Sequence, residues 1–552
     1  MREKWTGEEP RGLLARFFLP WAVLIVTAGL AAVSLGRYGL NVVAFGFLYA
    51  ALATSWNWMR ATGLFSFGQA AFFGAGALTQ GWLVTAGRIS PWLAFGASAA
   101  AGALAAIVLI PALRLRPASF GLATLVYAIL LKSLAGNAPA FGREGFLLPA
   151  TPGLDGATPA LLSILAVLAL AVSLGYESFL GRPSGRAATA IRQAPETSLA
   201  LGIGPIEERW RPVTMCAAAT ALAGALYAHL IGSVDASVVF SPTFSVLPLV
   251  LGMLGGALHP LGGILGTLAL YPLEELVLRP ALPRSHSLGY GVVLLGLLLL
   301  KPEGLLRPRI PRIPPLSTFR PAGHGAFALA VRSLTVRRNR STVLEDLRFV
   351  VEPGQILRVF GPNGAGKTSL LLAIAGRIPA ARGAILFGAA PAPGGAASRA
   401  RRGLARTFQA PRPFGDWTVR ENVAVAAERA GNLGGVDALL EDLELKALED
   451  RPAGQLSVGE GKRLEVARAL AANPAVLLLD EPLAGLTPRA TERVSSLIER
   501  ARRAGAAVVW VEHGPAAVES ASQVLVLEAG KTRFLGTPAD WEAAHRGPVV
   551  RS

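Results

Sequence analysis

The chain has 552 residues, of which 52% are hydrophobic and only 16% are charged, and its formal net charge is +17. Soluble domains usually contain about 25% charged residues, so long parts of this chain cannot be ordinary soluble structure. Much of the positive charge lies in loops between apolar runs, where it orients membrane proteins, and nucleic acid is therefore not an expected partner. The single cysteine, Cys216, lies inside an apolar run, so no disulfide framework or cysteine-based metal site is available.

Apolar runs that are long enough, or nearly long enough, to cross a bilayer occupy the first 305 residues. A hydrocarbon core about 30 Å thick requires about 20 helical residues. The predicted spans are 13–35, 39–59, 64–87, 91–112, 118–136, 158–181, 212–233, 244–278 and 287–305. Basic residues gather in alternate loops, which favours a cytoplasmic N-terminus. We expect the first run to be a retained helix and not a cleaved signal peptide, because it is long and further spans follow.

The stretch 244–278 is too long for one span, and it is interrupted by Gly255-Gly256, His259-Pro260 and Gly262-Gly263. Two short spans, or a re-entrant hairpin, would keep the domain that follows on the cytoplasmic side. Broken backbone at membrane depth must be covered by protein or must line a water-filled cavity. The stretch is therefore expected either to line a translocation path or to pack closely on neighbouring helices through its glycines.

Two other segments of this half carry polar signals. The interrupted stretch 63–74 contains Ser66 and Gln69, which either contact a transported substrate or bridge neighbouring helices. The loop 182–211 is too long and too basic for a simple turn. Its alanine, leucine and isoleucine spacing, followed by glycine, predicts short cytoplasmic helices; an ordinary charged loop at the lipid headgroups is the alternative.

Proline and arginine dominate residues 307–321, a composition that blocks helix and sheet and favours an extended spacer. The predicted organisation is therefore a transmembrane domain over 1–305, a linker over 306–325 and a second, more highly charged domain over 326–552.

The first functional motif of this second domain is a phosphate-binding loop. Residues 356–360 read as a short buried strand, Gly361–Thr368 form the glycine-rich loop, and an apolar helical pattern follows. This strand–loop–helix order lets backbone N–H groups surround phosphates at a helix N-terminus. Lys367 adds positive charge and the Thr368 hydroxyl can bind Mg²⁺. The predicted nucleotide-binding residues here are Gly361, Pro362, Asn363, Gly364, Ala365, Gly366, Lys367, Thr368 and Ser369.

A second strand, 475–479, ends in Asp480 and Glu481. An acidic residue at the carboxyl end of a strand can hold Mg²⁺, and the next carboxylate is placed to polarise an attacking water. A strand ending in surface acids is the structural alternative, which the phosphate-binding loop disfavours.

Three further motifs surround this pair: Leu456–Arg463 before a helical pattern, Gln409 after the strand-like 405–408, and His513 after the strand-like 507–511. Each motif alone is weak, but their order and spacing are specific. The second half resembles the ATP-binding-cassette family, with Gly361–Thr368 similar to its Walker A motif, Leu456–Glu460 to its signature and Asp480-Glu481 to its Walker B pair. Gln409 resembles the Q-loop residue and His513 the switch histidine.

This resemblance implies an α/β P-loop ATPase that uses ATP and Mg²⁺. It implies catalytic roles for Glu481, His513 and Gln409, and metal binding by Thr368, Gln409 and Asp480. In the family two cassettes face head to tail, so Ser457 and Gly459 would contact nucleotide held by a partner half, either a second copy or a paralogue.

A narrower resemblance joins the two halves. Residues 403–409 followed by 418–423 are similar to the ATPases of branched-chain (hydrophobic) amino acid importers, and 63–77, 113–116, 185–203 and 222–227 resemble the permease of the same systems. The implied fold is an all-α polytopic membrane domain followed by the cassette. Arg186, Glu196 and Gly202 match the importer coupling motif.

The implied function is ATP-driven import of a small polar solute, above all branched-chain or related amino acids, across the cytoplasmic membrane. The N-terminus and the ATPase domain would lie in the cytoplasm, and an extracytoplasmic solute-binding protein would deliver the cargo. Import of urea or short amides, or an exporter half-transporter, are the alternatives.

The motifs depart from the family pattern in several places. Val458 and Glu460 replace the common glycine and glutamine, and Arg338 falls where an aromatic residue usually stacks on adenine. Thr487 and Gly514 replace acidic or amide residues. Because the lysine, the metal ligands and the catalytic carboxylate all remain, we expect hydrolysis to be retained.

Overall fold

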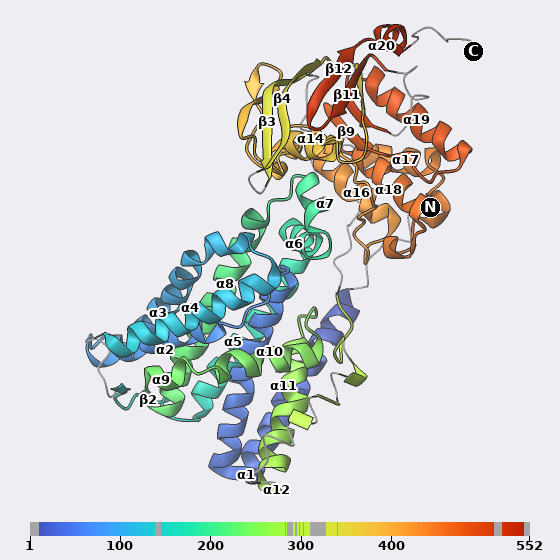
Figure 1. The fold of residues 1–552 in the computed structure, drawn as a ribbon. Helices are drawn as coiled ribbons and strands as arrows, with labels where there is room; N and C mark the ends of the chain where they lie inside the picture. Colours follow the sequence, from blue (N-terminus) through green and yellow to red (C-terminus); the bar gives the residue numbers. More distant parts are fainter. Residues whose placement is uncertain are drawn as a thin grey trace. The chain divides into compact units, whose positions relative to one another are not determined.

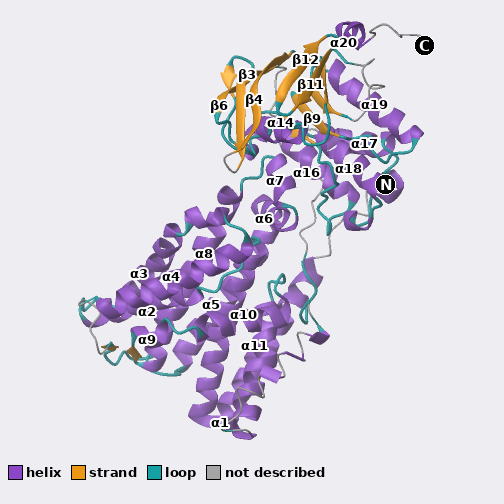
Figure 2. Ribbon diagram, viewed as in Figure 1, coloured by secondary structure: helices purple, strands orange, loops and turns teal. Residues whose placement is uncertain are grey.

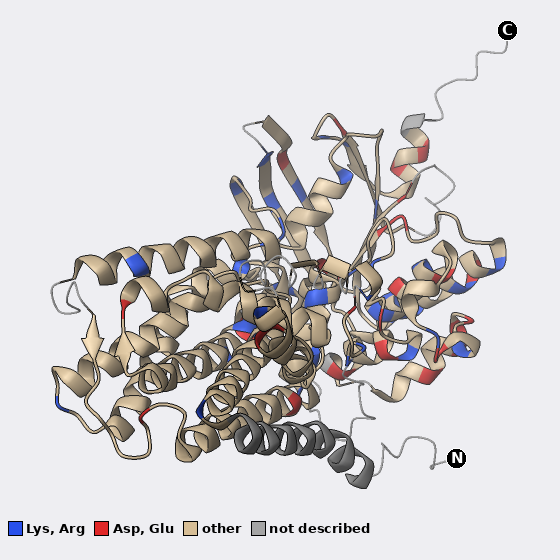
Figure 3. Cartoon of the chain, turned by 90° about the horizontal axis from the view of Figure 1, so that it is seen from below, with Lys and Arg blue, Asp and Glu red and all other residues tan. Residues whose placement is uncertain are grey.

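The computed structural model describes residues 10–138, 145–281, 283, 291–292, 295–296, 299–301, 303–309, 327–338, 341–431, 433–512 and 521–545. Its contacts divide the chain into two compact units, one formed by residues 1–192 with 205–311 and the other by residues 193–204 with 312–552. Figure 2 shows helices throughout the first unit and the larger sheets only in the second. In Figure 3, few positions along the helices of the first unit carry the colours of charged residues, whereas many positions of the second unit do.

The first unit is built from helices, labelled in Figure 1. They are α1 (Pro10–Ala61), α2 (Gln69–Thr85), α3 (Pro91–Val108), α4 (Pro117–Asn137), α5 (Pro159–Gly181), α6 (Pro183–Gln193), α8 (Pro205–Ile231), α9 (Ala236–Val239), α10 (Thr243–Gly256), α11 (Gly262–Pro272) and α12 (Arg279–Ala281). Turns of 3-10 helix (Ile110–Arg114) and π-helix (Leu273–Leu278) and a short antiparallel pair, β1 (Phe146–Leu147) with β2 (Ser233–Val234), complete it. The predicted all-α membrane domain is confirmed.

Six helical segments among the described residues are long and apolar enough to cross a membrane. They are Gly36–Ala61, Pro91–Val108, Pro117–Asn137, Pro159–Gly181, Pro205–Ile231 and Ala236–Gly256. The predicted division between 13–35 and 39–59 coincides with Gly36, where α1 leaves helical geometry with φ 58°. The predicted run 287–305 is described only in part, at 291–292, 295–296, 299–301 and 303–305. Proline at the first turn of α3, α4 and α5 starts these helices where its missing N–H costs no hydrogen bond.

The interruption predicted within 244–278 is present as a turn between α10 and α11. The amide of Gly262 donates to the carbonyl of His259 at 2.9 Å, and a Cβ added to Gly255 would lie 1.7 Å from the Gly262 carbonyl oxygen. The two helices therefore approach through their glycines, as close packing of membrane helices requires.

The second interruption separates α1 from α2, and its polar groups bond to neighbouring protein groups. The Ser66 carbonyl accepts from the Trp56 indole at 2.9 Å, and the Ser66 hydroxyl accepts from the Gly68 amide at 3.2 Å. Ser66 and Gln69 are both buried. The Ser66 hydroxyl therefore bonds locally, within the loop, and the choice between substrate contact and helix bridging stays a prediction.

The second unit contains two sheets. Their strands are β3 (Leu329–Arg338), β4 (Ser341–Val351), β5 (Ile356–Phe360), β6 (Arg382–Phe387), β7 (Ala390–Pro391), β8 (Leu404–Arg406), β9 (Val476–Asp480), β10 (Ala507–Val511), β11 (Gln523–Glu528) and β12 (Lys531–Gly536). The six-stranded sheet runs β12-β11-β5-β10-β9-β8 and is parallel except for β12, whereas β4-β3-β6-β7 is antiparallel.

Helices lie between and after the strands of this unit. They are α14 (Lys367–Ile374), α15 (Ala396–Arg401), α16 (Val419–Ala430), α17 (Val436–Asp442), α18 (Val458–Ala471), α19 (Pro488–Arg503) and α20 (Pro538–His545); α7 (Pro195–Ala200) also groups with it. Strands β5 and β9 flank β10, and all three are largely buried apolar segments. Their carboxyl ends meet at one edge of the sheet, where ligands of such sheets bind.

Candidate nucleotide-binding site

The loop after β5 has the backbone that a phosphate-binding loop needs. Gly361, Gly364 and Gly366 have φ values of 146°, 82° and 102°, a region that disfavours side chains. A Cβ on Gly361 would lie 2.3 Å from the Leu527 carbonyl oxygen, and one on Gly366 would lie 2.6 Å from Leu344 Cδ2. Pro362, Asn363, Gly364 and Thr368 are exposed, so a ligand can reach the loop and the first turn of α14; Ala365 is buried and Ser369 half-buried.

Lys367 begins α14 and lies over this loop. Its ammonium donates to the Gly361 carbonyl at 2.6 Å and to the Pro362 carbonyl at 3.1 Å. Burial lowers the pKa of Lys367, and the nearby charges of Glu481 and Asp480 act in the opposite direction. The lysine and the two predicted acids therefore belong to one electrostatic site.

The acidic pair lies at the carboxyl end of β9. Asp480 is 2% exposed, and its amide donates to the Thr407 hydroxyl at 3.1 Å. Burial, and then the charge of Glu481, raises the pKa of the Asp480 carboxyl. Glu481 has φ +48°, its amide donates to Val511 at 3.1 Å, and its carbonyl accepts from Lys462 at 3.0 Å. Backbone in this sparsely populated region is held by both neighbouring elements.

This donor set fits a magnesium nucleotide. The N-terminus of α14 and the glycine loop offer N–H groups and positive charge to phosphate oxygens. The Thr368 hydroxyl and the Asp480 carboxylate are hard oxygen ligands of the kind that Mg²⁺ takes together with phosphates. Gln409 is exposed and lies three positions after the end of β8 at Arg406. The predicted His513 lies outside the described residues.

The signature segment forms the N-terminus of α18. Ser457 is its N-cap: the Ser457 hydroxyl accepts from the Glu460 amide at 3.3 Å, and the Glu460 carboxylate accepts from the Ser457 amide at 2.8 Å. This capping box satisfies two amides of the first turn. The glutamate that departs from the family pattern therefore has a structural role here. Ser457 is exposed and Gly459 is half-exposed.

The predicted short helices within 182–211 are present as α6 and α7. Of the three predicted coupling residues, Arg186 is buried in α6, whereas Glu196 and Gly202 lie in and after α7. The Glu196 carboxylate pairs with Arg377 at 3.2 Å and also with Arg412.

Gly202 is placed by a further arginine. Its carbonyl accepts from Arg401 at 2.9 Å, its φ is +79°, and an added Cβ would lie 2.9 Å from Arg401 Cγ. Glycine is therefore required by both conformation and contact. Arg377, Arg401 and Arg412 were not predicted, because only the fold brings these separated arginines to α7.

Comparison with known proteins agrees with this architecture. Residues 344–484 match the model of the ABC transporter family, and residues 38–300 match the model described as branched-chain amino acid transport system / permease component. A high-affinity branched-chain amino acid transport ATP-binding protein of Pseudomonas aeruginosa is 32% identical over 233 residues, which are 38% of this chain and 91% of that protein.

Two other similarities concern the cassette. The lipopolysaccharide export system ATP-binding protein of Escherichia coli is 32% identical over 34% of this chain and 80% of its own length. A solved ATP-binding subunit of an ABC transporter is 25% identical, covers 39% of this chain and 92% of its own, and gives a TM-score of 0.38.

Together, the apolar helices and the ATPase fold define a membrane transporter that contains its own ATPase domain. The chain belongs to the ATP-binding-cassette transporter family and joins a branched-chain-type permease domain to its cassette in one polypeptide. The cassette binds ATP and couples its hydrolysis to transport.

Proposed function

We propose that this chain imports a small polar solute, branched-chain or related amino acids above all, across the cytoplasmic membrane. The observation that carries the proposal is the match of 38–300 to a branched-chain permease component in the same chain as an ATPase cassette. The permease comprises 1–305, the linker 306–325 and the cassette 326–552. The N-terminus and cassette lie in the cytoplasm, where ATP is available.

The glycine loop and Lys367 bind the phosphates of ATP, and Thr368, Asp480 and Gln409 hold its Mg²⁺. When bound, the magnesium nucleotide supplies the phosphoanhydride bond whose hydrolysis drives transport. Glu481 accepts a proton from the attacking water, and His513 and Gln409 position that water. Ser457 and Gly459 contribute to the site held by the partner half, either a second copy or a paralogue.

The segment 193–204, which contains α7, transmits the movement of the cassettes to the permease. The Glu196 ion pairs and the Arg401 contact to Gly202 attach this segment to the cassette fold. Closure of two cassettes would move both α7 segments, and hydrolysis would reset them, provided that ATP binds the closed state preferentially. A solute-binding protein outside the membrane delivers the cargo.

Uptake into proteoliposomes containing the full chain and a candidate solute-binding protein tests this function. We expect leucine to accumulate only with ATP on the cassette side, and Glu481→Gln to abolish accumulation while ATP binding remains. The matched control, Glu492→Gln, changes an exposed carboxylate on α19 and should leave uptake unchanged. Undiminished uptake by Glu481→Gln would contradict its catalytic role, and movement of solute in the opposite direction would favour an exporter.

A further inference from the structure

A buried carboxylate on the signature helix contacts the Q-loop backbone. Glu465 lies in α18 and is 3% exposed. One of its oxygens accepts from the Phe408 amide at 3.2 Å, and the other accepts from the Arg412 amide at 2.8 Å. These two amides lie on either side of Gln409, so a single side chain of α18 fixes both ends of the segment that presents this glutamine.

The charge of Glu465 is neutralised locally. Arg468, one turn further along α18, donates to the same carboxylate at 2.6 Å, and both side chains are at most 4% exposed. Arg468 also donates to the Arg412 carbonyl at 3.3 Å. Burial of a charged side chain is costly unless the charge is paired and hydrogen-bonded in this way. The pair therefore holds Arg412 at both its amide and its carbonyl.

Arg412 also contacts the α7 segment. Its carbonyl accepts from the Thr197 hydroxyl at 2.7 Å, and its guanidinium pairs with Glu196. The Asp416 amide donates to the Gln193 side chain at 3.0 Å, a few residues further on. The same short segment is therefore bound by the signature helix through Glu465 and by the docked segment through Glu196 and Thr197.

A ladder of main-chain hydrogen bonds forms a second connection between the Q-loop and the signature. The segment 415–420 follows the Q-loop, and 449–454 precedes the signature. Their hydrogen bonds are Gly454 to Gly415 at 3.0 Å, Ala453 to Trp417 at 2.8 Å, Val419 to Arg451 at 3.0 Å and Arg420 to Glu449 at 3.0 Å, each written from amide to carbonyl. Buried Asn422 bonds the carbonyl and amide of Phe414 at 3.0 and 2.9 Å, which holds the first segment in place.

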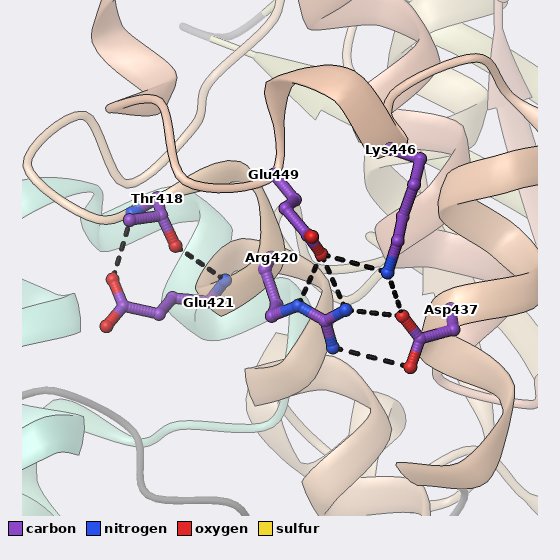
Figure 4. A network of polar contacts seen from close by, with 6 residues as sticks. All are labelled: Thr418, Arg420, Glu421, Asp437, Lys446 and Glu449. Carbon is purple, nitrogen blue, oxygen red and sulfur yellow. Dashed lines mark hydrogen bonds and ion pairs between the residues drawn. The ribbon is translucent and has the colours of Figure 1, made fainter. Parts of the chain in front are cut away.

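The side chain of Arg420 also bonds the Glu449 side chain at 2.7 Å, beside the Thr418–Glu421 capping box (Figure 4). The ladder ends three residues before Ser457. The start of α18 and the loop after Gln409 are thus held together by main chain as well as by Glu465.

We propose that Glu465 is a positioning residue that makes the Q-loop, the docked α7 segment and the signature helix move as one piece. The proposal rests on the transport function proposed above. Because Glu465 contacts backbone amides and Arg468, its substitution should alter coupling between hydrolysis and transport more than binding of ATP.

Glu465→Gln in the full chain tests this role. An amide presents one acceptor and one donor, so one of the two backbone amides loses its partner and Arg468 loses its counter-charge. We expect the ratio of solute transported to ATP hydrolysed to fall by about 2- to 30-fold, the range typical of coupling residues, while the affinity for ATP changes less than about 2-fold. Glu441→Gln, an exposed carboxylate on α17, is the matched control and should keep the wild-type ratio.

A second readout does not depend on the cargo. Hydrogen exchange of amides in 408–414 and in α7 should accelerate in Glu465→Gln, whereas exchange in α14 should not change. Thr197→Val, which removes only the hydroxyl donated to Arg412, should accelerate exchange in the same segments and should be non-additive with Glu465→Gln. If Glu465→Gln does not fold, Glu465→Asp, which keeps the charge but shortens the side chain, replaces it in both measurements and in the comparison with Thr197→Val.

An unchanged transport ratio, equal loss of hydrolysis and transport, or additive exchange effects would overturn the role of Glu465. Failure of the wild-type chain to move amino acids would refute the proposed cargo alone. The exchange measurements would then still decide the role of Glu465.

Discussion

Asp437 belongs to a group of exposed or half-exposed charges, with Arg420, Lys446 and Glu449, that fastens α17 to the start of α16 (Figure 4). Hydrogen bonds from Arg420 and then Lys446 hold the pKa of the Asp437 carboxyl below its ordinary value. A carboxyl whose folded pKa is depressed contributes stability above its unfolded pKa. That contribution is lost as the pH falls through the folded value.

We therefore expect Asp437→Asn to lower stability by about 0.2–1 kcal/mol at neutral pH, the amount usual for exposed ion pairs. The difference from wild type should stay constant from about pH 7 to pH 5 and shrink below about pH 4, because the ordinary pKa of aspartate is about 3.9. Thermal unfolding of the full chain in detergent at several pH values measures this. Asp450→Asn, at a neighbouring exposed position, is the control, and an equal effect in both variants would contradict the specific pairing.

Single residues differ in how well the sequence predicts their positions. The glycine loop, Lys367 and the acidic pair could be placed because each motif is contiguous and comes with its own strand and helix. Glu465 and Arg412 could not, because their contact joins residues 53 apart in the chain. The sequence shows Glu460 only as a departure from the family pattern, and the capping hydrogen bonds give it a structural role.

At the scale of elements, helix starts and breaks were predictable, since proline and glycine act locally. The kink at Gly36 and the turn between α10 and α11 fall where the sequence indicated. The partners of each helix were not predictable, because small residues can pack against any neighbour. The structure shows that α3 and α8 approach through Gly102, where an added Cβ would lie 2.4 Å from Ala221 Cβ and 2.6 Å from the Ala217 carbonyl oxygen.

Gly102→Val should therefore destabilise the membrane unit by about 1–3 kcal/mol, the usual cost of overpacking. Gly96→Val in the same helix meets no atom within 4 Å and is the matched control. Thermal unfolding in detergent measures the stability of both variants. The two substitutions add the same side-chain volume and change the helix propensity equally. Equal destabilisation would mean that helix propensity, and not the α3–α8 contact, sets the cost.

For the whole molecule, the predicted composite ATP sites make complementation a test of pairing. Each site would combine Lys367 of one chain with Ser457 of the other. We expect Lys367→Ala and Ser457→Arg each to abolish hydrolysis when alone. Co-expressed, they should recover a measurable fraction of it, because mixed dimers contain one intact site. Absence of mixed dimers, tested with two affinity tags, would indicate pairing with a paralogue, whereas mixed dimers that form but recover no activity would contradict the composite sites.

The grouping of residues 193–204 with the cassette has a consequence for how strongly the two halves must attract each other. Residues 193–204 are held by the two ion pairs of Glu196 and by a few hydrogen bonds, and ion pairs that are this exposed are individually weak and sensitive to salt. Here the polypeptide itself keeps the docking partners at a high effective concentration, so weak bonds suffice. Cleavage within 312–325 should therefore leave a complex that survives in dilute buffer and dissociates as ionic strength rises. In the intact protein the cassette stays attached at any salt concentration.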